Sequence, residues 1–151
     1  MKKILLIVTI FVISLTIVGC GSKNVEGTLE ELMTKVYSTL KEDETPMMLT
    51  NIEVTQKNAE MYLGSANIEF EEALASESAT GSIAHSVVLL RVKDNTDVEK
   101  VKEKIKNSIN PRKWICVEAE KVKVESKGNL ILIVMSSKAT TDKITTEFNN
   151  L

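Results

Sequence analysis

The only histidine, His85, is the first residue to consider for acid–base or nucleophilic chemistry in this sequence. Ser82 and Ser86 flank it in the sequence. A serine that is hydrogen-bonded to a histidine forms part of the catalytic triad of hydrolases. A triad also needs an orienting carboxylate and an oxyanion pocket, which a glycine-rich GxSxG elbow commonly provides, and the chain contains no such elbow. We therefore expect a hydrogen-bonded structural histidine, with an acid–base pair between His85 and a glutamate of residues 69–77 as the alternative.

The sequence predicts neither a metal site nor an enzyme active site. Cys116 lies in the apolar stretch 114–117 without a neighbouring base, so we expect a structural, unreactive thiol. One histidine and one remaining thiol cannot make a zinc site of the usual ligand count. The glutamates of residues 69–77 are possible ligands of a hard cation, but calcium loops are rich in Asp and Gly. A solvated strand edge is therefore the expectation for these glutamates.

The other cysteine, Cys20, ends a segment with the layout of an export signal. Two lysines precede an apolar run over residues 4–18, which is shorter than the ~20 residues of a membrane span. Residues 17–20 (IVGC) resemble the lipobox of bacterial lipoproteins. That resemblance implies cleavage after Gly19 and a thioether-linked diacylglycerol on Cys20, whose two acyl chains anchor the protein firmly. An uncleaved signal anchor is the alternative, and no other cofactor is expected.

These features divide the chain into a signal peptide (1–19), a lipidated cysteine with a short linker (20–27) and a single domain (28–151). The linker reaches at most ~25 Å, so we expect the domain to lie close to the extracytoplasmic face of the cell membrane. The chain has 19 basic and 21 acidic side chains, and removal of the two signal-peptide lysines leaves 17 and 21. A domain with this acidic balance has no electrostatic basis for binding nucleic acid.

Two segments carry side chains suited to a partner surface. Met47 and Met48 follow a proline, and methionine thioethers adapt to apolar partners as well as they fill cores. Arg112 and Lys113 precede Trp114, the only tryptophan, and Trp with Arg is a frequent combination at interface hot spots. Core packing is the alternative at both segments.

The elements that position these residues begin with a helix. Thr28 and Glu31 have the spacing of a capping box, and apolar residues then recur every three or four positions as far as Leu40. We expect Pro46 to end this helix, because the residue before a proline avoids helical geometry. Residues 47–64 predict only a short strand and one helical turn.

Two hairpin–helix units follow, each with two strands joined by a short turn. In the first unit, the helix is expected to start directly after Thr96, which has the spacing of another capping box with Glu99. In the second unit, the helix is expected to start near Thr140 or Thr141. Residues 113–117 predict a further strand or extended edge before the hairpin. The expected strands cover residues 68–76 and 83–93 in the first unit and 120–126 and 130–135 in the second.

The order of these elements predicts an α+β fold. Consecutive hairpins favour an antiparallel sheet, and helices with one apolar stripe each can all cover the same face. We expect a two-layer sandwich in which two hairpin–helix units build the sheet, with helices on one face and an additional N-terminal helix.

Several stretches of the domain resemble a known family. These stretches are residues 71–78 (EEALASES), 82–94 (SIAHSVVLLRVKD), 98–102 and 110–120 (NPRKWICVEAE). They are similar to small lipoproteins of Gram-positive, clostridium-like bacteria called Domain of Unknown Function 4358, and the similarity runs from about Leu29 to the C-terminus. It implies a lipid-anchored α+β domain without an established activity, associated with envelope acyl-transfer systems, and it assigns no functional residue.

The function expected from these observations is a non-enzymatic binding module at the outer face of the membrane. The membrane holds it through the lipid, and the partner is an envelope protein or a wall polymer. A small ligand-binding accessory of a transporter is one alternative, although such proteins commonly have two lobes with a cleft between them. An accessory of an envelope-modifying acyl-transfer system is another, and an enzyme that acts on envelope material through His85 and a glutamate of residues 69–77 is the third.

Overall fold

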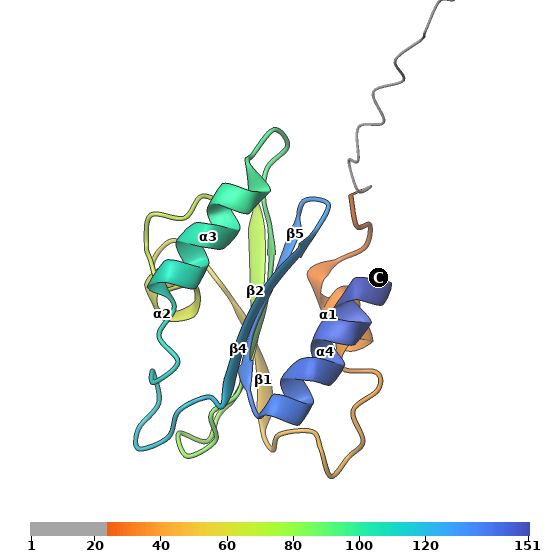
Figure 1. Cartoon of the computed structure of the whole chain (residues 1–151), viewed down its shortest axis with the longest axis vertical. Coiled ribbons are helices and arrows are strands. Elements are labelled where there is room, and N and C mark those ends of the chain that lie inside the picture. Colours follow the sequence, from red (N-terminus) through yellow and green to blue (C-terminus); the bar gives the residue numbers. More distant parts are fainter. Residues whose placement is uncertain (1–23) are drawn as a thin grey trace, which may run out of the picture.

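The computed structural model describes residues 24–151, which form a five-stranded antiparallel sheet with four helices (Figure 1). The strands lie in the order β1-β2-β3-β5-β4, so β1 and β4 are the two edges. The expected signal peptide and Cys20 lie outside the described residues. The elements are α1 (Leu29–Val36), β1 (Leu49–Glu53), α2 (Ala59–Leu63), β2 (Glu72–Ser78), β3 (Ser86–Arg91), α3 (Val98–Ser108), β4 (Lys121–Lys127), β5 (Leu130–Ser136) and α4 (Lys138–Asn150).

Strands β3 and β5 form the centre of the sheet because both are apolar on their two faces. Every residue from Leu130 to Ser136 is buried, and β5 pairs with β3 in a register that places Leu89 opposite Leu132. Gly128 lies in the tight turn between β4 and β5 with φ of +58°, a conformation that glycine adopts without a steric cost. Both expected hairpins, β2–β3 and β4–β5, are present, but β2 covers Glu72–Ser78 instead of residues 68–76.

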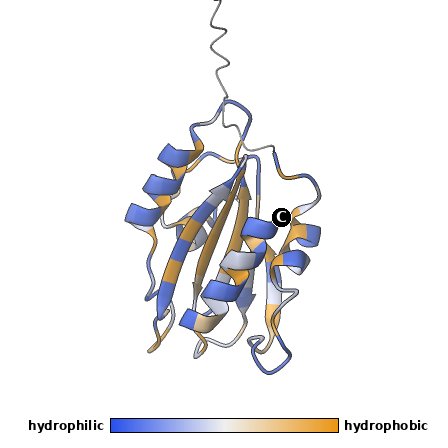
Figure 2. Cartoon of the chain, turned by 45° about the vertical axis from the view of Figure 1, so that its right-hand side comes forward, coloured by the Kyte–Doolittle hydropathy of each residue, from blue (hydrophilic) through white to orange (hydrophobic). Residues whose placement is uncertain are grey.

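The α+β class and the antiparallel sheet of two hairpin–helix units are confirmed, but the helices cover both faces of the sheet (Figures 1 and 2). Val88 and Leu90 pack with α2 and α3 in one apolar cluster. Val87 and Leu89 pack with α1 and α4 in a second cluster on the opposite face. Alternate residues of a strand point to opposite faces, so strands that are apolar throughout need a cover on each side. The domain therefore has three layers instead of the expected two.

Helices α1, α3 and α4 each begin directly after a residue whose side chain caps the helix. The first residues of α3 and α4 differ from the expected positions. The Thr28–Glu31 capping box is present, with both of its hydrogen bonds at 3.2 Å. Helix α3 is capped by Asp97, whose Oδ1 accepts a hydrogen bond from the Lys100 N–H at 3.1 Å, so the expected capping box one residue earlier is wrong. Helix α4 starts at Lys138, before the expected Thr140 or Thr141, because the Ser137 side chain caps it.

Two expected boundaries are corrected in the loops. Helix α1 ends at Val36, well before Pro46, because Tyr37 and the residues after it form turns with their own local hydrogen bonds. Residues 113–117 form a loop instead of a strand, and Cys116 within it has φ of +64°, which is incompatible with a strand.

Glycine is required where α2 ends against α3. Gly64 caps α2 with φ of +78°, and a Cβ atom there would lie 2.4 Å from the backbone of Ser108. No other residue type fits this close approach. None of the helices in residues 24–151 is long and apolar enough to cross a membrane.

Candidate functional site

We call the end of the sheet beside the N-terminal segment the near end and the opposite end the far end (Figure 1). The two ends bring different residues together. At the near end, the Arg91 guanidinium donates hydrogen bonds to the carbonyl oxygens of Val25 and Gly27, at 2.6 and 2.7 Å, and its Nε lies 2.7 Å from Glu72 Oε1. The first described residues are thereby fixed to the sheet. The far end is where β2 ends, β3 begins and β5 ends, and the residues singled out in the sequence gather there.

His85 is at the centre of a buried polar network at the far end, on the face covered by α1 and α4. Its side chain is fully buried, its Nε2 lies 2.6 Å from the Tyr37 hydroxyl, and its Nδ1 lies 2.8 Å from Ser136 Oγ. Burial lowers the pKa of His85 to about 4 and raises the pKa of Tyr37. The imidazole is therefore neutral near pH 7, and both ring nitrogens are hydrogen-bonded, as expected of a structural histidine.

The alternative acid–base pair is not formed. Glu77 is the buried glutamate of residues 69–77, but it points to the opposite face of β2 and pairs with Lys113. The partners of His85 are also not its sequence neighbours Ser82 and Ser86, because they are Tyr37, which caps the C-terminal end of α1, and Ser136 at the end of β5.

Lys113 forms a second buried network, on the face covered by α2 and α3. Its side chain is 8% exposed, it forms an ion pair with Glu77, and its Nζ lies 3.3 Å from Ser86 Oγ. The same Nζ lies over the rings of Tyr62 and Trp114, 4.7 and 5.2 Å from their centroids. Burial lowers the pKa of Lys113, and the Glu77 carboxylate opposes that effect. Lys113 is therefore a buried anchor of its loop, and its expected place on a partner surface is wrong.

Met47 and Met48 are exposed, at 67% and 66%, so the core-packing alternative is wrong for this segment. Their backbone is nevertheless fixed. Ser78 Oγ donates a hydrogen bond to the Met47 carbonyl at 2.8 Å, and the Ala79 N–H donates one to the Met48 carbonyl at 3.0 Å. Met48 has φ of +54°, which is strained for a side chain other than glycine. Two apolar side chains are thus held in solvent on an ordered backbone.

The loop between α3 and β4 also exposes apolar surface. Ile115 is 79% exposed, and the exposed Cys116 has the second strained φ of this end, so the expectation of a structural thiol packed in apolar surroundings is wrong. Arg112 is exposed and its Nε lies 3.0 Å from Glu118, while Trp114 is half-buried. Arg112, Trp114, Cys116 and Glu118 line one shallow hollow.

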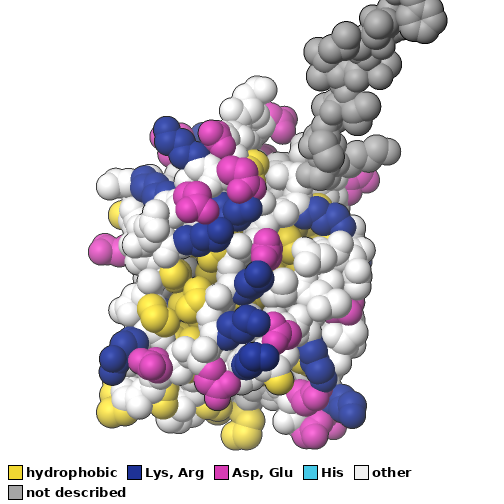
Figure 3. Space-filling model, viewed as in Figure 1, with side chains coloured by type: hydrophobic (Ala, Val, Ile, Leu, Met, Phe, Trp, Pro, Cys, Tyr) yellow, Lys and Arg dark blue, Asp and Glu magenta, His cyan; other side chains and the backbone are white. Residues whose placement is uncertain are grey.

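The structure brings the two predicted segments to the same end of the sheet. Glu77 and Ser78 are adjacent in β2 and point to opposite faces, and they hold Lys113 and Met47 respectively. Hydrophobic side chains are exposed at this lower end of the molecule in Figure 3. Sequence reasoning missed Ile115 and the buried polar partners, because the partners come from distant strands and helices. We call Met47, Met48, Arg112, Trp114 and Ile115 the far-end surface.

The fold and this surface define a three-layer α+β domain whose sheet is fixed to the N-terminal segment at one end and exposes apolar side chains at the other. Residues 24–151 contain no group of three or more His, Cys, Asp or Glu side chains placed to hold a metal ion. No family model, curated protein or solved structure matches the chain. The similarity to Domain of Unknown Function 4358 therefore stays a prediction.

Proposed function

We propose that this chain is a lipid-anchored extracytoplasmic module that binds a partner protein of the cell envelope through its far-end surface. The anchor is the diacylglycerol expected on Cys20, and the proposed activity is binding without catalysis. The partner presents an apolar patch to the methionines and Ile115.

The single observation that carries the proposal is the position of the exposed apolar side chains. Within residues 24–151 the large exposed hydrophobics are Met47, Met48, Met61 and Ile115. The first two precede β1 at the far end, Ile115 lies in the loop held there by Lys113, and the Met61 carbonyl lies 3.4 Å from Lys113 Nζ. Single exposed hydrophobics need no explanation, but here two segments held on fixed backbone, Met47–Met48 and the loop with Arg112, Trp114 and Ile115, expose apolar side chains at the same end of the sheet. Exposed apolar side chains together with Arg and Trp are typical of interaction sites.

The near end supports the placement of this surface away from the membrane. Arg91 fixes Val25 and Gly27 to the sheet, and Val25 is buried in the apolar cluster below α1. Only residues 21–24 then separate Cys20 from the folded domain, a length of ~14 Å when extended. A tether of this length keeps the near end at the bilayer and turns the far end outward.

A comparative pull-down tests this function. The full-length chain and two double variants, Met48→Ser with Ile115→Ser and Arg112→Ala with Trp114→Ala, are purified from crosslinked membranes and their partners are quantified by mass spectrometry. We expect both variants to lose at least about tenfold of the partners that the wild type recovers. Lys93→Ser, an exposed change at the near end, is the matched control and retains them.

Thermal unfolding of each variant shows that the comparison is made between folded proteins. Recovery of the same partners in the same amounts by both folded double variants would contradict the proposed surface.

A further inference from the structure

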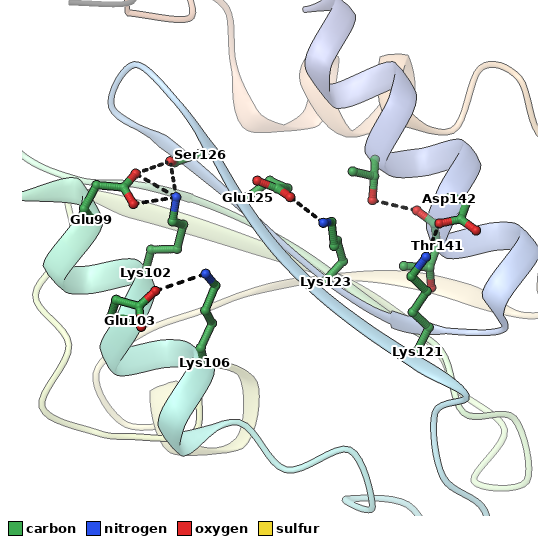
Figure 4. Close-up of polar contacts among 11 residues, drawn as sticks. Glu99, Lys102, Glu103, Lys106, Lys121, Lys123, Glu125, Ser126, Thr141 and Asp142 are labelled. Carbon is green, nitrogen blue, oxygen red and sulfur yellow. Dashed lines mark hydrogen bonds and ion pairs between the residues drawn. The ribbon is translucent and has the colours of Figure 1, made fainter.

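The edge strand β4 is protected against pairing with another chain (Figure 4). It runs between α3 and α4, and its lysines hold internal partners: Lys121 pairs with Asp142, and Lys123 lies 2.7 Å from Glu125. Ser126 donates a hydrogen bond to Glu99 at 3.0 Å. Lysines on an edge strand and helices beside it are common devices against strand addition.

Within residues 24–151, the opposite edge, β1, lacks such lysines, and only Ile52 packs against the apolar cluster that contains α2. Its sequence, LTNIE, contains no lysine or proline, and its register with β2 is unbroken from Leu49 opposite Ser78 to Glu53 opposite Leu74. The Thr50, Asn51 and Glu53 side chains are exposed. Among the described residues, β4 is thus the protected edge of the sheet and β1 the open edge.

Two hydrogen bonds show which backbone groups of β1 are free to pair outward. The Ala79 N–H donates to the Met48 carbonyl at 3.0 Å, and the Val54 N–H donates to the Ala73 carbonyl at 2.9 Å. In an antiparallel pair, residues alternate between those bonded to the neighbour and those whose N–H and C=O point away from it. Since positions 48 and 54 bond to the β2 side, the N–H and C=O groups of Leu49 and Asn51 and the N–H of Glu53 point to the open edge. The Glu53 carbonyl points the same way but accepts a hydrogen bond from Asn58 Nδ2 at 3.1 Å, so an added strand would pair mainly with Leu49 and Asn51.

We propose that the partner adds an extended segment to β1 as a sixth strand of the sheet. This inference rests on the proposed function and specifies how the far-end surface is used. Met47 and Met48 directly precede β1, so a strand laid along β1 continues onto these exposed side chains. The backbone bonds provide affinity and the side chains at the two ends of β1 provide specificity, as in other complexes formed by strand addition.

The charges along β1 define the chemistry of the added segment. Glu30, Glu53, Glu71 and Glu72 line one shallow hollow at the end of β1 away from the methionines. Within the described residues Glu72 has an ion pair with Arg91, whereas the other three have none. A segment with Lys or Arg beside Glu53 and apolar residues beside Leu49 and Met48 complements this edge.

A second copy of this chain fits the open edge poorly in either direction. Antiparallel pairing of two β1 strands turns the near ends in opposite directions, and a tether of residues 21–24 does not allow both copies to reach one bilayer. Parallel pairing places the acidic end of one copy beside the acidic end of the other. The occupant is therefore a different envelope protein.

In-cell photo-crosslinking of the full-length, membrane-anchored chain tests the inference. A photo-reactive benzoylphenylalanine replaces Met47, and the yield of the crosslinked product is compared with and without Asn51→Pro. Proline at position 51 removes an N–H that points outward and places a ring where the partner backbone would lie, without removing a bond to β2. We expect the yield to fall about tenfold or more.

Val122→Pro is the matched control on the other edge. Lys127 pairs with Leu130 across a two-residue turn, so by alternation the Val122 N–H also points away from its neighbouring strand. We expect this change to leave the crosslinking yield unchanged. Asn51→Lys is an exposed substitution that places a lysine on β1, like the lysines on β4. It gives a second test that does not depend on how proline affects folding, and we expect the crosslinking yield to fall for this variant too.

The outcomes separate this inference from the proposed function. A product that forms equally in wild type, Asn51→Pro and Asn51→Lys would overturn strand addition while leaving a partner at the far-end surface. The absence of any product from position 47 would overturn both. Loss in the two Asn51 variants together with retention in Val122→Pro supports the sixth strand.

Discussion

Single residues at the far end of the sheet show how polar groups can be buried without being left unsatisfied. His85 shares its two ring nitrogens between Tyr37 and Ser136, and Lys113 divides its ammonium between a carboxylate, a hydroxyl and two aromatic rings. Burying such groups without partners would cost several kcal/mol. These side chains fix the backbone that presents the far-end surface.

The buried His85 predicts a loss of stability in mild acid. Its pKa is about 4 in the folded protein and about 6.5 in the unfolded chain, so below pH 6.5 the unfolded state binds a proton that the folded state does not. The free energy of unfolding should fall between pH 6.5 and 4, by about 3 kcal/mol from this group.

Urea unfolding of wild type and His85→Gln at several pH values between 7 and 4 measures this effect. Glutamine can bond to both Tyr37 and Ser136 but does not titrate, so the difference between the two proteins should narrow as the pH falls. A difference that stays constant across this range would contradict a buried neutral imidazole.

The ion pair between Lys113 and Glu77 predicts strong coupling between these residues. Glu77→Gln leaves a buried ammonium without its carboxylate and should lower the free energy of unfolding by about 3 kcal/mol. Replacing both residues by methionine removes both charges and should recover most of that loss. Equal losses in the single and double variants, measured by chemical denaturation, would argue against a buried pair.

Sequence reasoning recovers some residue-level features and not others for a physical reason. The Thr28–Glu31 cap is local, and both of its bonds form as predicted. The partners of His85 are 48 and 51 residues away, so only the strand register and the helix packing bring them together. The sequence marks His85 as buried by its apolar neighbours but contains no local signal for its partners.

Among the elements, patterns with a strong period are the ones that sequence predicts well. The apolar runs of β3 and β5 are unmistakable, and the order hairpin, helix, hairpin, helix follows from them. The same runs also contain the reason for three layers, because both faces of a fully apolar strand need covering. The apolar residues of 113–117 predict a strand, but these residues form a loop in which Lys113 pairs with Glu77 and Cys116 has a positive φ.

The edge strand β1 provides a prediction at the scale of an element. The Thr50 N–H points to β2 by the same alternation that directs the Asn51 N–H outward. Thr50→Pro should therefore lower the free energy of unfolding by about 2–3 kcal/mol, while Asn51→Pro changes it by less than about 1 kcal/mol. Equal destabilisation by the two prolines in thermal or chemical unfolding would show that the backbone alternation is wrong.

At the scale of the whole molecule, the proposed tether and the proposed binding surface lie at opposite ends of the sheet. Arg91 ties Val25 and Gly27 to the near end, and the strained Met48 and Cys116 lie at the far end. Backbone strain away from glycine is common at functional sites, where surrounding contacts maintain it. A tether at one end and an exposed apolar surface at the other is the arrangement that a membrane-held binding module needs.

The hydrogen bonds of Arg91 lead to a prediction about how firmly the segment before α1 is held against the sheet. Arg91→Met keeps the bulk of the side chain and removes all three hydrogen bonds of the guanidinium. Amide hydrogen exchange measured on residues 24–151 should become faster in the first residues through α1 and stay unchanged in β3 and β5. Unchanged exchange before α1 would mean that the guanidinium is not what fixes this segment.

The anchor is tested most directly by mass spectrometry of the N-terminal peptide of the protein purified from its membranes. We predict a mature chain that begins at Cys20 and carries the mass of a thioether-linked diacylglycerol, with Cys20→Ser abolishing both the modification and the cleavage. An unmodified Cys20 still joined to Gly19 would contradict the proposed membrane-held module.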